Sequence, residues 1–135
     1  MSTTAGVPAT TGAGAPETFS ERLRAATRSD HRAAEDHGFT RALMDGTLSL
    51  AGYTGMVAQH YFAYAALEEA GRRLAEDPVA GRFHHPELER VPALVRDLEH
   101  LLGADWRGRI APTPATRTYA ARIEQTADHP EGFVA

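Results

Sequence analysis

Four charged or titratable side chains in one short segment would share a face if that segment is an α-helix. They follow one another at spacings of four, three and four residues, and they are Arg24, Arg28, His31 and Glu35. These spacings bring side chains onto one side of a helix. A neutral imidazole is a good donor to a transition metal, and arginines pair well with carboxylates. The row would therefore suit a flat ligand with a metal at its centre and anionic groups at its edge.

The carboxylate in this row has a definite place in such a site. Glu35 lies one turn beyond His31 and could accept a hydrogen bond from the ring N–H that does not face the metal, which would fix the tautomer. A plainer interpretation stays open, because a row of charges on a helix is usually a solvated face. On the spacing alone the solvated face is favoured. His37 is the nearest competing histidine, but it stands six positions beyond His31 and would face away.

Other residues that could do chemistry favour simpler interpretations. Tyr61 and Tyr64 are more often core residues than site residues. His84, His85 and His100 could suggest zinc, but the adjacent pair would point in different directions, and no third ligand stands at a clear spacing. The sequence has no pair of Glu-x-x-His motifs for a di-iron bundle, no phosphate-binding glycine loop and no Gly-x-Ser-x-Gly.

Composition excludes several classes of protein. The 135 residues fit one domain, and 18 acidic against 14 basic side chains give a net charge of -4. This charge argues against a nucleic-acid-binding protein. There is no cysteine, so disulfides and thiolate sites are excluded. We expect no membrane span, because no apolar run reaches about 18 residues, and no secretory signal at the start, so the expected location is cytoplasmic.

Capping signals place the first elements that would position the charged row. Residues 1–17 are rich in Thr, Ala, Gly and Pro, and we expect a flexible tail there. Thr18 and Glu21 fit a capping box at the start of a helix. That helix would end by Gly38, and a short second one would end at Gly46.

The remaining signals are also helical. Ser49 would cap the longest helix, which is expected to continue to about Asp77. Pro92 predicts a bend or restart before a helix that ends at Gly103, and residues 104–112 are expected to be loop. Thr113 and Pro114 would open a last helix that ends before His129. No alternating strand pattern occurs, so the sequence predicts an all-α fold, with one helical domain over residues 18–135.

Four blocks of the sequence resemble the heme oxygenase family. They occur in the family's order and cover nearly everything from residue 20 to the end. The blocks are LRAATRSDHRAAE, GTLSLAGYTGMVAQHYFAYAALEEA, PELERVPALVRDLEHLLGADW and PATRTYAARIEQTADHPEGFVA. Together they resemble the N-terminal portion of the bacterial, biliverdin-producing type.

The resemblance implies a helical bundle in which heme lies between a proximal and a distal helix. His31 falls on the axial iron ligand, and Glu35 on the acid that hydrogen-bonds this histidine. Arg24 and Arg28 fall on basic positions near the heme propionates. In this resemblance the heme is both cofactor and substrate.

The resemblance also includes two tyrosines of a polar network, and it stops before the family's distal helix. Tyr64 and Tyr119 fall on tyrosines of the network behind the distal pocket. In the family, a His-x-Tyr pair and a Gly-Asp-Leu-Ser-Gly-Gly stretch come next and form the distal helix. We therefore expect a partial heme oxygenase-like domain, truncated before the distal helix, that carries the proximal half of the site.

The activity implied by the resemblance is oxidative cleavage of heme to biliverdin, with release of iron and carbon monoxide. It uses dioxygen and external electrons from a reductase or ferredoxin. Two alternatives stay open. One is a heme-binding helical module, or inactive fragment, without turnover. The other is a helical interaction protein with no cofactor.

Overall fold

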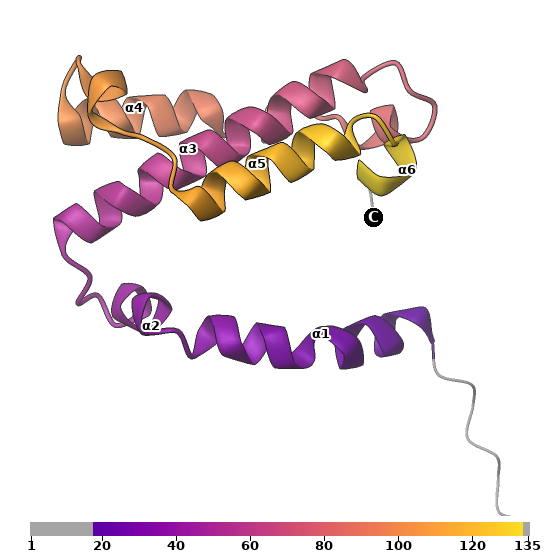
Figure 1. The fold of residues 1–135 in the computed structure, drawn as a ribbon, viewed down its shortest axis with the longest axis horizontal. Helices are drawn as coiled ribbons and strands as arrows, with labels where there is room; N and C mark the ends of the chain where they lie inside the picture. The colour runs from indigo at the N-terminus through magenta and orange to yellow at the C-terminus, as the bar shows by residue number, and fades with distance from the viewer. Residues whose placement is uncertain (1–17, 134–135) are drawn as a thin grey trace, which may run out of the picture. The chain divides into compact units, whose positions relative to one another are not determined.

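A computed structural model describes residues 18–133, and within that range every regular element is a helix (Figure 1). The chain divides into two compact units, Met1–Asp45 and Gly46–Ala135. The predicted flexible tail, residues 1–17, lies outside the described residues. No helix among the described residues is long and apolar enough to cross a membrane.

The first unit contains helices α1 (Phe19–Glu35) and α2 (Gly38–Met44). The predicted capping box at the start of α1 is confirmed. The backbone N–H of Thr18 donates to the Glu21 carboxylate at 2.7 Å, and the N–H of Glu21 donates to the Thr18 hydroxyl at 3.3 Å. These bonds lower the pKa of Glu21, since the backbone N–H of Thr18 and then its hydroxyl favour the charged carboxylate.

The second helix begins with a cap that the sequence pattern does not indicate. The Nδ1 atom of His37 accepts the N–H of Phe39 at 3.3 Å. An ion pair of 2.7 Å between Arg41 and Asp36 spans the junction between α1 and α2. Gly46 follows with a φ of 67°, a left-handed conformation that favours glycine, so the predicted end of this helix is confirmed.

The second unit is built on α3 (Leu50–Arg73). Its predicted cap is confirmed, because the hydroxyl of Ser49 accepts the N–H of Gly52 at 3.1 Å. The helix ends at Arg73, earlier than the predicted Asp77. The Asp77 carboxylate accepts the N–H groups of Val79 and Ala80 at 2.9 and 2.8 Å, so it shapes the following turn instead.

Short helical turns lead from α3 into α4. They are η1 (Ala80–Phe83) and η2 (Pro86–Leu88), and α4 itself is Val91–Leu102. A side chain at Gly81 would collide with the carbonyl oxygen of Ala75, so only glycine fits at this close approach. The helix α4 restarts at Pro92, as predicted, and ends at Gly103, where φ is 85°.

The chain then runs through η3 (Trp106–Arg109) into α5 (Pro114–Thr126) and the short α6 (Pro130–Phe133). The predicted cap of α5 is confirmed by a 3.2 Å bond from the N–H of Thr116 to the Thr113 hydroxyl. The expectation that residues 104–112 form only loop is wrong, because this segment contains η3. The sequence pattern also gave no indication of α6.

The three long helices of the second unit pack side by side (Figure 1). One core cluster lies near the start of α3 and joins it to α4 and η3; it consists of Val57, Ala58, Leu98 and Trp106. The other lies near the end of α3 and joins it to α5; it consists of Ala70, Leu74, Ala80, Ile123 and Ala127. These contacts make α4 antiparallel and α5 parallel to α3.

Trp106 is the centre of the first cluster. Its side chain is 0% exposed. The ring of Tyr61 meets it edge-on at 4.9 Å, and the guanidinium carbon of Arg107 lies 4.3 Å from its centroid. Tyr61 is thus a core residue, and the segment expected to be a loop supplies the anchor of the core.

Two polar side chains of α3 fix its neighbours. Glu68 accepts the N–H groups of Arg90 and Val91 at 2.6 and 3.0 Å, so α3 caps the start of α4. Gln59 donates to the carbonyl of Ala111 at 3.2 Å and accepts the N–H of Thr113 at 2.9 Å. Helix α3 therefore sets where both neighbouring helices begin.

Candidate functional site

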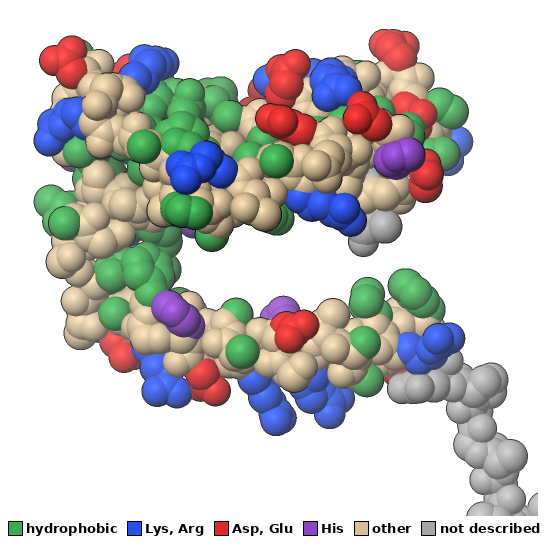
Figure 2. Space-filling model, viewed as in Figure 1, with side chains coloured by type: hydrophobic (Ala, Val, Ile, Leu, Met, Phe, Trp, Pro, Cys, Tyr) green, Lys and Arg blue, Asp and Glu red, His purple; other side chains and the backbone are tan. Residues whose placement is uncertain are grey.

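The structure brings the four charged residues singled out in the sequence to one face of α1. His31, Arg24, Arg28 and Glu35 all line one open hollow. The hollow belongs to α1 alone, and no residue of this helix is buried. Charged side chains lie beside exposed hydrophobic ones along this helix (Figure 2). The predicted juxtaposition is therefore present.

Two large apolar side chains also border this hollow, and they were not among the residues predicted from the sequence. Phe19 and Leu23 line the same hollow and are 76% and 52% exposed. The signal was available, because Phe19, Leu23, Thr27 and His31 follow one another every four residues. Thr27 lies between them with its hydroxyl bonded to the Leu23 carbonyl at 3.0 Å. The face thus combines an apolar strip with charges.

None of the four charged side chains is committed to a partner within residues 18–133. Neither a hydrogen bond nor an ion pair joins them to another described residue, and His31 and Glu35 are not bonded to each other here. Both ring nitrogens of His31 are open to a ligand, as are the guanidinium groups of Arg24 and Arg28. Imidazole and guanidinium are the donors that a metal with surrounding carboxylates requires.

His37 differs from His31 in this respect. Its Nδ1 accepts the N–H of Phe39 and so caps α2. Ligation through that nitrogen would leave the N–H of Phe39 without its cap. Of these two histidines, only His31 is free of a structural task.

The tyrosines implied by the family resemblance come together in the second unit. Tyr64 of α3 and Tyr119 of α5 line one hollow with Leu67 and Ile123. His60 lies in the same hollow, and its ring centroid is 6.3 Å from that of Tyr64, in an edge arrangement. His60 was not predicted from the sequence as a site residue, although its spacing of four from Tyr64 places both on one face.

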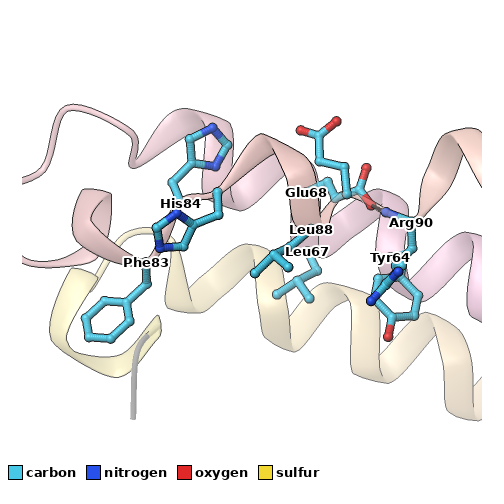
Figure 3. A pocket seen from close by; sticks show the side chains of 10 residues that line it. Tyr64, Leu67, Glu68, Phe83, His84, Leu88 and Arg90 are labelled. Carbon is cyan, nitrogen blue, oxygen red and sulfur yellow. Dashed lines mark hydrogen bonds between the residues drawn. The ribbon is translucent and has the colours of Figure 1, made fainter.

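A second hollow adjoins the first and is shown in Figure 3. It shares Tyr64 and Leu67 with the first, and Phe83, His84 and Leu88 are among its other lining residues. His85 lies at its edge with Nδ1 3.6 Å from Glu87. No group of three or more side chains that could hold a metal ion occurs among the described residues.

Comparisons with known proteins assign this chain to a family. The model of the heme oxygenase family matches residues 17–135. Heme oxygenase 1 of Nostoc sp. is 32% identical over 118 residues, which are 87% of this chain and 50% of the relative. Chicken heme oxygenase 1 is 38% identical over 119 residues, which are 87% of this chain and 40% of the relative.

Solved structures give the same result. Heme oxygenase 1 of Synechocystis sp., solved in complex with heme, superposes with a TM-score of 0.75 at 30% identity. The match covers 82% of this chain and 50% of that one. The chain thus spans about half the length, or less, of the relatives it matches. With a family model that matches all of the described residues and a solved relative of the same helical fold, this chain belongs to the heme oxygenase family.

Proposed function

We propose that this chain binds heme on the hollow face of α1 and supplies the proximal half of a heme oxygenase. The observation that carries the proposal is His31, an uncommitted imidazole on one face with two free arginines and a carboxylate. His31 would ligate the iron through one ring nitrogen. Glu35 would accept the N–H of the other nitrogen and hold the ring's tautomer.

The rest of the face fits a large flat ligand with acidic edges. Arg24 and Arg28 would form charge-assisted hydrogen bonds with its carboxylates. Phe19 and Leu23 would lose exposed apolar area against its ring system. The solved Synechocystis relative is described as a complex with heme.

The proposed activity of the whole protein is oxidative cleavage of heme to biliverdin, with release of iron and carbon monoxide. Heme is the substrate and also supplies the redox-active iron; dioxygen and a reductase or ferredoxin supply the oxidant and electrons. His31 and the arginines bind and orient it. Tyr64 and Tyr119 are proposed members of the polar network behind the distal pocket, where their hydroxyl groups would donate and accept hydrogen bonds. The proposed location is the cytoplasm, which cell fractionation would test.

A heme-binding module without turnover is the second candidate. The comparisons do not favour it over the oxygenase, since every relative named above is a heme oxygenase. Heme held on one helix face would bury less apolar surface than heme enclosed on both sides. Each Å² of buried apolar surface contributes roughly 25 cal/mol to the binding free energy. We therefore expect residues 1–135 alone to bind heme more weakly than a full-length relative, with little or no turnover.

The two candidates separate in one experiment. Titration of the purified chain with heme should give a Soret band that saturates at one equivalent; failure to form this band contradicts both. The complex is then treated with a chemical reductant in air. Clean conversion to biliverdin at the rate of an intact relative would show that all catalytic groups lie within residues 1–135, and a persistent Soret band would favour the module.

A further inference from the structure

The side chain of Gln59 in α3 makes two hydrogen bonds to the segment that leads into α5. Its Nε2 atom donates to the carbonyl of Ala111 at 3.2 Å, and its Oε1 atom accepts the N–H of Thr113 at 2.9 Å. A primary amide can both donate and accept, whereas a carboxylate only accepts and an aliphatic side chain does neither. Because the two bonds engage alternate residues, they fix which part of this segment lies opposite α3.

The same segment determines where α5 begins. The hydroxyl of Thr113 accepts the N–H of Thr116 at 3.2 Å and caps the helix, and Arg117 donates to the carbonyl of Pro112 at 2.6 Å. The starting residue of a helix sets the direction of every later side chain, since each residue turns the helix by about 100° and advances it by about 1.5 Å. Gln59 therefore fixes the rotation of α5 about its own axis.

Tyr119 is a residue of α5 whose place depends on this rotation. It lines one hollow with Tyr64 of α3, yet it is 60% exposed, so burial of its own ring does little to hold it there. The only buried residue of α5 is Ile123, which belongs to the cluster near the other end of the helix. The half of α5 that carries Tyr119 thus relies more on the polar bonds of Gln59 than on the core.

Gln59 acts on this hollow from outside it. Its side chain is half-buried and does not line the hollow of Tyr64 and Tyr119. It lies on the same helix as Tyr64, five positions earlier, so one rigid element carries both Tyr64 and the group that orients the helix of Tyr119. Any effect of Gln59 on the two tyrosines must pass through Thr113 and α5.

We propose that Gln59 is a positioning residue for the pair of Tyr64 and Tyr119. Its two bonds set the rotation of α5 that brings Tyr119 to the hollow beside Tyr64. The consequence for the reaction rests on the proposed function, in which both tyrosines belong to the polar network. The placement of the tyrosines themselves does not depend on heme binding.

Fluorine NMR of residues 1–135 labelled with fluorotyrosine tests the placement directly. The sequence has four tyrosines, and single Tyr→Phe variants assign their signals. Gln59→Leu removes both bonds and should move the signals of Tyr64 and Tyr119 by more than a linewidth. The signal of Tyr61 should stay in place, because this ring packs edge-on against the buried Trp106. Gln59→Glu keeps the acceptor for the N–H of Thr113 and should restore most of the shift.

The matched control is Arg73→Gln, which removes the 3.2 Å ion pair with Asp128 that ties the far end of α5 to α3. It should lower the Tm slightly and leave both tyrosine signals in place. Unmoved signals in folded Gln59→Leu, or equal shifts in Arg73→Gln, would overturn the proposal.

If Gln59→Leu fails to fold, Gln59→Asn decides. Its amide is one methylene shorter and cannot make both bonds unless α5 moves, so the Tyr119 signal should still shift, and an unchanged signal would count against Gln59. Failure of the chain to bind heme would contradict the proposed function and leave these results as they are.

Discussion

The two units of the chain acquire their structure in different ways. In α1 no residue is buried, and a capping box stabilises the start of the helix. In the second unit, two apolar clusters join three long helices. Most of the stability of a helix in a protein comes from tertiary packing of its apolar face. The face that carries the candidate ligand residues is therefore the part whose stability depends most on a bound ligand or partner.

The largest effect should come from breaking the core of the second unit. Trp106→Ala removes a side chain that is 0% exposed, and such changes cost about 3–5 kcal/mol. Urea unfolding followed by circular dichroism should show the loss. Hydrogen exchange at the amides of α1 should stay as in the unsubstituted chain, because that helix shares no cluster with Trp106. Reduced protection throughout α1 would instead show that the helix loses its structure together with the core around Trp106.

The next effect concerns ligation by the first unit. His31→Ala should remove the imidazole–iron signature from the resonance Raman or electron paramagnetic resonance spectrum of the heme complex, and leave the Tm of the second unit unchanged. His37→Ala is the matched control: it should keep the signature and loosen the start of α2, since His37 caps that helix. The reverse pattern would assign the ligand to His37.

A smaller effect tests the charges around the ligand. Loss of one exposed charge-assisted contact costs about 1 kcal/mol or somewhat more. Arg24→Glu should therefore weaken heme binding more than Arg24→Ala, and added salt should narrow the difference. Arg22→Glu, with the same charge change on the same exposed helix but outside the hollow, should have less effect. Equal affinities for all these forms would show that α1 carries only a solvated row of charges.

The smallest effect comes from the capping box. The pKa of Glu21 is lowered in the folded helix. Its contribution to the stability of the helix is therefore fully present above the ordinary glutamate pKa of 4.5 and is lost as the pH falls through the lowered pKa. Helicity of α1 should decline in that acidic window. Glu21→Gln should reduce this pH dependence in amide exchange near the start of α1. An unchanged profile would mean that the box does not support the helix.

Elements fixed by local interactions could be predicted from the sequence, whereas those fixed by long-range contacts could not. Thr18, Ser49 and Thr113 were recognised as helix caps because each acts within three residues of itself. The early end of α3 was missed because Asp77 bonds to the turn that follows it. The turn at Trp106 was missed because contacts from α3 and α4 stabilise it, and no local pattern encodes them.

The candidate site shows the same contrast. The shared face of Arg24, His31 and Glu35 could be predicted, since one helix carries all three. The meeting of Tyr64 with Tyr119 was implied only by the family resemblance, because it depends on how α5 lies along α3.

The packing of Trp106 also provides an optical label. The sequence has one tryptophan, and residues 18–45 contain neither tryptophan nor tyrosine. Excited at 295 nm, the chain should emit from a single indole, shielded from water and beside Tyr61. That emission reports on the second unit alone, whereas circular dichroism at 222 nm adds the helices of the first. Divergence between the two signals during denaturation would measure how independently the units melt, with no dye or substitution.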